Sequence, residues 1–264
     1  MLRCAASFVT AAYETVRLIP QDLRALPPDL FAKPFRNCIF IKYGKGEDMT
    51  HSLHREGSLE SLEREYVLFI YPARGFNYKG SAQKVRSMVE LLYQAGPVNM
   101  IPTSLRRNMY SGVRPEEILE SITVEGTRVY SVFNDREKLK KALILLKKAD
   151  EGISVMVSGV TDRVREIASE LGIEPHMVNL SLGIHGRTDR LAPADIREFT
   201  TMCGHGVVSP HLVKDMIRRV KTGKVSDWDA SVLLAEPCTC GIYNPYRSVE
   251  LLREKAPLYT VDRW

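Results

Sequence analysis

Long apolar runs are scarce in this 264-residue chain. No stretch free of Asp, Glu, Lys and Arg exceeds 15 residues, the length of the stretch from Phe199 to Val213. Glycine, histidine and proline interrupt it, and a helix that spans a bilayer needs about 20 apolar residues. The first residues do not resemble an export signal either, because Glu14 and Arg17 follow ten uncharged residues of mixed polarity without a small-residue cleavage pattern. The sequence therefore predicts a cytoplasmic protein with no membrane partner.

Cysteine is also sparse. Five cysteines are an odd number in a chain of this size and do not suggest a disulfide framework. In a reducing compartment, clustered thiols more often indicate metal or redox chemistry.

A concentrated basic stripe is missing as well. Lys and Arg total 37 against 32 Asp and Glu, and the net charge of +5 favours anionic ligands only mildly. Nucleic acid is therefore not the expected partner. With 44% hydrophobic and 26% charged residues, the composition is typical of a globular protein.

What is present is an alternation of apolar strands and amphipathic helices. The runs Tyr66–Tyr71 and Ile153–Val157 predict buried strands, and Met177–Leu182 predicts another. Helical spacing follows from Ser81 to Gly96 and from Asp162 to Glu170. This alternation predicts an α/β fold whose mostly parallel sheet has helices on both faces.

The chain divides into three predicted parts. Residues 1–64 have no clear pattern and are expected to form a peripheral arm, a possible means of homo-oligomer formation. Residues 65–182 form the sheet domain. Residues 183–264 form a small helical, cysteine-containing region that packs on the sheet, because no long Gly/Ser/Pro linker separates the two.

The most informative residues lie in two glycine-flanked loops, Cys203-Gly204-His205-Gly206 and Cys238-Thr239-Cys240-Gly241. Helices are predicted to start at Ser209-Pro210, at Ser226 and at Asn244-Pro245. If the first two form an antiparallel hairpin, both loops return to the same end and the three thiols converge. The amino ends of two helices would then face the thiolates and lower their pKa.

The predicted ligand set does not decide the identity of the metal. A [4Fe-4S] iron-sulfur cluster fits three local thiols, with His205 as a ligand or base, or with one iron open to a substrate. Zinc is the alternative, although Cys238 and Cys240 are closer in sequence than the two to four residues usual in zinc knuckles. The remaining alternative is three buried thiols without a metal.

Several polar residues are candidates for binding a small anionic substrate. Gly75–Ser81 follows a predicted strand and opens a helix, where backbone amides hold anions in α/β proteins. The equivalent turn in the next unit ends at Thr161, and we expect both at the carboxyl edge of one sheet. After the last strand, His185 is a candidate acid or base and Asp189 its orienting carboxylate. The predicted substrate-binding side chains are Arg74, Lys79, Ser81, Thr161 and Arg187.

These residues predict a metalloenzyme. An iron-sulfur cluster with an open iron favours lyase chemistry, such as dehydration or desulfuration, and complete ligation favours oxidoreductase chemistry. Two alternatives remain. One is a zinc-stapled module whose basic helix from His211 to Lys224 binds nucleic acid or a protein partner, and the other is a metal-free enzyme with Cys240 as nucleophile.

Overall fold

The computed structural model describes most of the chain from Arg55 onward and one earlier strand. The described residues are 39–43, 55–105, 107–110, 112–180, 186–203 and 205–260, with the backbone alone for 39–43 and 178–180. The predicted acid or base His185 and the predicted domain boundary between residues 182 and 183 lie outside them.

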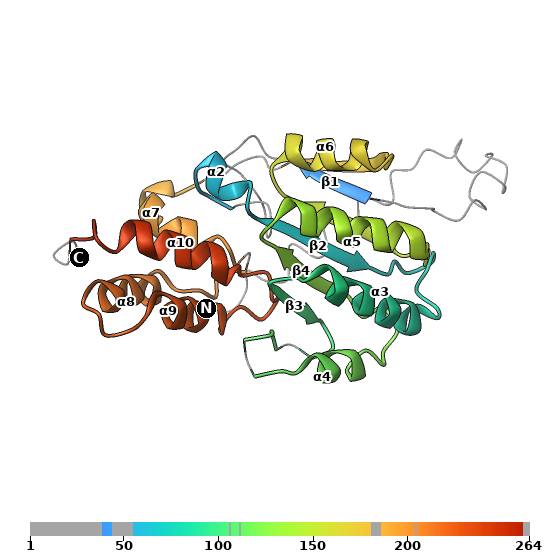
Figure 1. Cartoon of the computed structure of the whole chain (residues 1–264), viewed down its shortest axis with the longest axis horizontal. Coiled ribbons are helices and arrows are strands. Elements are labelled where there is room, and N and C mark those ends of the chain that lie inside the picture. The colour runs from blue at the N-terminus through green and yellow to red at the C-terminus, as the bar shows by residue number, and fades with distance from the viewer. Residues whose placement is uncertain are drawn as a thin grey trace. The chain divides into compact units, whose positions relative to one another are not determined.

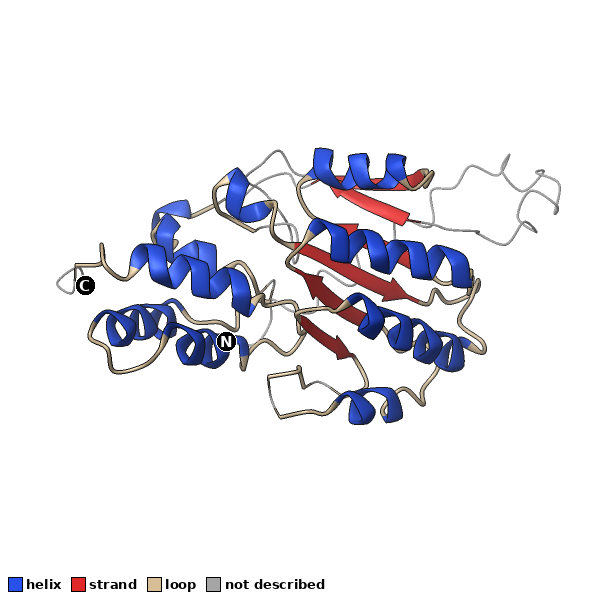
Figure 2. Ribbon diagram, in the orientation of Figure 1, coloured by secondary structure: helices blue, strands red, loops and turns tan. Residues whose placement is uncertain are grey.

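A six-stranded sheet with the strand order β3-β4-β2-β5-β1-β6 forms the centre of the fold (Figures 1 and 2). The strands are β1 (Ile39–Tyr43), β2 (Tyr66–Tyr71), β3 (Asn99–Pro102), β4 (Val129–Phe133), β5 (Ser154–Ser158) and β6 (Pro175–Leu180). The helices are α2 (Leu59–Leu62), α3 (Ser81–Ala95), α4 (Pro115–Glu120), α5 (Arg136–Ala149), α6 (Thr161–Glu170), the 3-10 turn η4 (Thr188–Arg190), α7 (Ala194–Thr200), α8 (Pro210–Lys221), α9 (Asp227–Ala235) and α10 (Pro245–Lys255).

The mixed α/β composition is confirmed, but the prediction of a mostly parallel sheet is wrong. Strand β2 runs antiparallel to both β4 and β5, and β3 runs antiparallel to β4. Only β1 pairs in parallel, with β5 on one side and β6 on the other.

The interleaving of strands explains this difference. Helices α3, α5 and α6 each connect two strands of the same direction, as a crossover should, but another strand lies between the two. Strand β4 separates β2 from β3, and β2 separates β4 from β5, so these neighbours pair antiparallel. Strands β2 to β5 have the split β-α-β pattern of a ferredoxin-like topology, a name that describes strand order alone.

The segment Ile39–Tyr43 differs from the expected peripheral arm. It forms β1 inside the sheet, paired in parallel with β5 and β6. The arm predicted for residues 1–64 therefore contributes an interior strand.

Side chains of β2 alternate between two buried cores. Leu68 and Ile70 pack with apolar residues of α3, α5 and α6, which lie along one face of the sheet in Figure 1. Val67 and Phe69 face the other way and pack with apolar residues of α7 to α10. The carboxy-terminal helices thus share a core with the sheet.

Candidate metal centre

Three buried thiols converge in the helical region. The Sγ atoms of Cys203, Cys238 and Cys240 all lie within 4.8 Å of one another, and those of Cys238 and Cys240 are 3.6 Å apart. The exposed fractions of the three residues are 2%, 0% and 4%. The predicted convergence of the two loops is therefore confirmed, and the triad could hold a metal ion.

The helix order brings the loops together. Cys203 precedes α8, Cys238 and Cys240 follow α9, and the two helices pack against each other, as seen in Figure 1. The predicted caps are also confirmed. The side chains of Ser209, Ser226 and Asn244 each accept a hydrogen bond from a backbone N–H in the first turn of α8, α9 and α10.

The two loops share a hydrogen bond between their first and fourth residues. Gly206 N–H donates to Cys203 O at 3.0 Å, and Gly241 N–H donates to Cys238 O at 3.1 Å. Both glycines have a left-handed conformation, with φ of 67° and 61°. In each turn the cysteine comes first and the glycine fourth, so His205 stands at the third position of one turn where Cys240 stands in the other.

The histidine lies beside the thiols. His205 is exposed, yet its Nδ1 is 3.2 Å from Cys240 Sγ. One imidazole nitrogen therefore lies beside Cys240, while the group of ligand atoms that all lie within 4.8 Å of one another consists of the three cysteines. Thiolates and imidazoles are ligands of zinc and of other thiophilic metals.

Backbone amides near the sulfurs favour their charged form. The amides of His205 and Val207 contribute to the lowered pKa of Cys203, and the amide of Ile242 acts on Cys238 in the same lowering direction. Amide donors around thiolates stabilise their negative charge, whether the charge is free or bound to a metal.

The three thiols shift one another's pKa in opposite directions. Hydrogen bonds from Cys238 and then from Cys240 lower the pKa of Cys203 to about 2. The bond to Cys203 raises the pKa of Cys238 to about 11, and bonds to Cys203 and Cys238 raise the pKa of Cys240. A metal ion binds cysteine as the thiolate, so binding to all three would release protons.

The edge strand β3 and the segment after it hold the second loop. A Cβ atom on Gly241 would lie 2.6 Å from Ile101 Cγ2, so only glycine allows this approach. Asn108 Nδ2 donates to the carbonyl oxygens of Ala235 and Cys238, both at 3.0 Å. Asn99 Nδ2 donates to Tyr243 O at 3.0 Å.

Sequence reasoning missed these supporting amides. Asn99 could have been noticed as a polar residue in the apolar run Val98–Ile101, where a buried side chain needs a partner. Asn108 lies in a polar loop, and nothing in its local sequence signals its role.

The predicted anion-binding turn before α3 already holds a carboxylate of this chain. Glu125 accepts hydrogen bonds from Gly80 N at 3.0 Å, Ser81 Oγ at 2.9 Å and Ala82 N at 3.2 Å. Arg74 stacks on the ring of Tyr78, 5.5 Å from its centroid. The amino end of α3 therefore carries an internal anion where the sequence suggested a ligand, and a substrate role for Arg74, Lys79 and Ser81 stays a prediction.

The other predicted substrate-binding residues do not join the turn before α3 in one site. Because β2 and β5 are antiparallel, with Val67 opposite Ser158, the loop after β5 that leads to Thr161 lies at the sheet edge opposite the loop after β2. The expectation of a common edge is therefore wrong. Arg187 and Asp189 are exposed and form a two-bond ion pair, with contacts of 2.8 and 2.6 Å.

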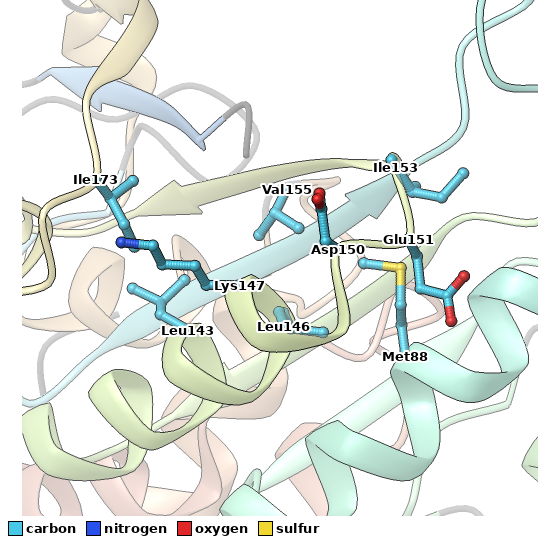
Figure 3. A pocket seen from close by; sticks show the side chains of 10 residues that line it. Met88, Leu143, Leu146, Lys147, Asp150, Glu151, Ile153, Val155 and Ile173 are labelled. Carbon is cyan, nitrogen blue, oxygen red and sulfur yellow. The ribbon is translucent and has the colours of Figure 1, made fainter. Parts of the chain in front are cut away.

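The small cavity in Figure 3 lies away from the cysteines. Its volume is about 30 Å³, roughly the space of one water molecule. Its apolar lining, which includes Met88, Leu146 and Val155, belongs to the core under α3 and α5, whereas the three cysteines belong to the core on the other face of the sheet. This cavity is thus no substrate pocket for the cysteine centre.

Comparison of the chain with protein-family models, with curated proteins and with solved structures finds no match. Among the described residues, no helix has the length and apolar character needed to cross a membrane.

Proposed function

We propose that the protein binds a single zinc ion through the thiolates of Cys203, Cys238 and Cys240 and the imidazole of His205. The observation that carries this proposal is the approach of three Sγ atoms within 4.8 Å of one another, with His205 Nδ1 3.2 Å from Cys240 Sγ.

The distances suit one tetrahedral ion. With Zn–S bonds of about 2.3 Å, two thiolates on the same ion lie about 3.8 Å apart, and a thiolate and an imidazole nitrogen lie about 3.6 Å apart. The separation of Cys238 and Cys240 is 3.6 Å, and that of His205 and Cys240 is 3.2 Å. The three thiolates already lie within 4.8 Å of one another, and the imidazole of His205 would complete the site by turning toward Cys203 and Cys238.

The same distances fit an iron-sulfur cluster poorly. In a cubane cluster each cysteine binds a different iron, so its thiolates stand farther apart than thiolates that share one ion. The sulfur triangle, with all sides within 4.8 Å, is too small for that arrangement without movement of the loops. The amide groups near the sulfurs are the one feature that also suits a cluster, and metal analysis distinguishes the two.

We infer a structural role for the ion. Four protein ligands leave no open coordination position, which is characteristic of structural zinc. The ion would join the loop before α8 to the loop after α9, and Asn108 and Ile101 connect the second loop to the sheet side of the fold. Zinc would thus fasten the helical region to the sheet.

The basic face of α8 is already used within the protein. Arg218 and Arg219 both pair with Asp215, and Lys221 Nζ donates to the carbonyl oxygen of Tyr259 at 2.6 Å. These contacts favour a structural module over the nucleic-acid-binding module that the helix alone suggested.

Metal content tests the proposal. Protein purified anaerobically without added metal should contain one equivalent of zinc and no inorganic sulfide, and its cobalt-substituted form should show tetrahedral thiolate bands. Cys203→Ser should abolish stoichiometric zinc, and His205→Ala should weaken zinc binding roughly 10- to 100-fold. The matched control is His211→Ala, an exposed histidine on α8, which should bind zinc as the wild type does. A brown protein with iron and sulfide would instead establish a cluster.

The contact between Cys240 and His205 supports a second candidate, a thiol enzyme. A cysteine with an imidazole at hydrogen-bond distance is the arrangement of a nucleophile with its base, and here the imidazole would have to deprotonate Cys240 against the two neighbouring thiols that raise its pKa. Alkylation separates the two roles. A zinc-bound Cys240 should resist iodoacetamide until a chelator is added, whereas a free nucleophile should react at once and without a chelator.

A further inference from the structure

Three fully buried charged side chains adjoin the cysteine centre. Arg55, Glu65 and Arg247 have exposed fractions of 0%, 1% and 1%. Arg55 forms an ion pair with one carboxylate oxygen of Glu65, and Arg247 Nη1 lies 2.5 Å from the other. We call this group the arginine triad.

The arginine triad has an excess positive charge. Two guanidinium groups share one carboxylate, so its net charge is +1, and an unbalanced buried charge is costly without a nearby counter-charge. Replacement of such triads by apolar residues is often neutral or stabilising, so fold stability alone is a weak reason for its presence.

Arg55 connects the triad to both cysteine loops. Its Nη2 donates to the carbonyl oxygen of Met202 at 3.2 Å and to that of Ile242 at 2.7 Å. Met202 directly precedes Cys203, and Ile242 lies two residues after Cys240. One guanidinium therefore holds the two loops at a fixed separation.

The other ion pairs named here match each partly buried cation with a partly buried carboxylate. Arg197 pairs with Glu56 at 2.7 Å, and Lys255 pairs with Glu198 at 3.1 Å and also with the exposed Glu254 at 3.7 Å. Arg247 uses its remaining donors on Ser61 Oγ and on the carbonyl oxygen of Glu56. The positive charge of the triad is thus not cancelled by these neighbours.

The proposed metal complex carries the opposite charge. Zn²⁺ with three thiolates and a neutral imidazole has a net charge of −1. We propose that the arginine triad is the internal counter-charge of the metal centre, and that Arg55 is the positioning residue that delivers this charge to both cysteine loops. This inference rests on the proposed zinc site.

Two substitutions that change the net charge of the arginine triad in opposite directions test this inference. Arg55→Met reduces the net charge of the triad to zero, and Glu65→Gln raises it to +2, while both break the same ion pair. Zinc affinity is measured by competition with a chromophoric chelator, and the cobalt-substituted forms are compared by their thiolate-to-metal bands. Lys255→Met is the matched control, because it removes a positive charge from the helical region at a residue whose side chain pairs with Glu198 and Glu254.

We expect Arg55→Met to bind zinc about 10- to 100-fold more weakly, the usual effect of losing a supporting contact around a metal site. Glu65→Gln should bind at least as tightly as the wild type, although it is also less stable. Lys255→Met should be unchanged. If Arg55→Met does not fold, Arg55→Lys replaces it and should bind more weakly than Glu65→Gln, because lysine keeps the charge but cannot span both carbonyl oxygens.

Equal weakening by Arg55→Met and Glu65→Gln would overturn the inference, because it would reduce the triad to a structural role. Wild-type affinity in Arg55→Met would overturn it as well and leave the zinc site intact. A wild-type protein that binds neither zinc nor cobalt would overturn the proposed function itself.

Discussion

Gly241 offers the most direct test of the cysteine-loop geometry, because a matched control lies in the other loop. Gly206 and Gly241 both occupy the fourth position of their turn, with φ of 67° and 61°. A Cβ on Gly206 would meet nothing within 4 Å, whereas a Cβ on Gly241 would lie 2.6 Å from Ile101 Cγ2 and 3.2 Å from Ile101 N. The two alanine variants therefore share the backbone cost and differ in the steric one.

The magnitudes follow from these two terms. A left-handed conformation costs an L-residue about 1–2 kcal/mol, and this should be the whole effect of Gly206→Ala on the free energy of unfolding. Overlap with a packed neighbour adds about 1–3 kcal/mol, so Gly241→Ala should lose about 2–5 kcal/mol. The backbone atom of Ile101 is what makes the overlap costly, because strand β3 cannot rotate away as a side chain can.

Urea unfolding of the zinc-saturated proteins, followed by circular dichroism, measures both losses. Adding Ile101→Ala to Gly241→Ala should recover part of the second loss, so the double variant should be more stable than the sum of the single effects predicts. Equal destabilisation by the two glycine substitutions would show that the second loop does not lie against β3, and the arrangement of the centre described here would be incorrect.

Two further predictions concern the residues around the loops. Asn108→Ala should lower the free energy of unfolding by about 1–3 kcal/mol, because it leaves buried carbonyl oxygens unpaired, and it should also weaken zinc binding. The control is Asn77→Ala, which breaks side-chain bonds far from the cysteines. It should leave zinc affinity unchanged in the same chelator competition. Hydrogen bonds from Ser81 and from backbone amides of the first turn of α3 lower the pKa of Glu125 below its usual 4.5, so the stability they provide is present above that pH and is lost as the pH falls through the lowered pKa. The thermal midpoint of the wild type should therefore fall more steeply than that of Glu125→Gln from about pH 6 to about pH 3, and parallel curves would contradict this account.

The local sequence predicts single elements well but not their pairing. The strand Tyr66–Tyr71 and the starts of α8, α9 and α10 are confirmed because an apolar run, a proline or a capping side chain acts within a few residues. Strand direction depends on which strand enters between the two ends of a crossover. That choice is made by contacts far apart in sequence, so the antiparallel neighbours of β2 were not predictable from alternation.

The cysteine centre likewise has parts that the local sequence predicts and parts that it does not. Three thiols in two glycine-flanked loops were visible in the sequence, and their convergence follows from one helix hairpin. The role of Arg55 was not visible in the sequence, because this residue lies in a polar stretch that resembles a solvated loop. Its partners Met202 and Ile242 are 147 and 187 residues away. A buried arginine is recognisable only once the surrounding fold is known.

The equivalence of the two turns accounts for the tight spacing of the cysteines. A zinc knuckle has two to four residues between its cysteines, whereas in the proposed site each loop would supply one ligand at its first position and one at its third. The third positions are His205 and Cys240, so His205→Cys should convert the donor set to four sulfurs and keep one equivalent of zinc. The cobalt form should gain thiolate charge-transfer intensity, and the complex charge should become −2. Retention of zinc by His205→Cys without any gain in thiolate charge-transfer intensity of its cobalt form would show that residue 205 does not stand at a ligand position and that the centre is a three-sulfur site.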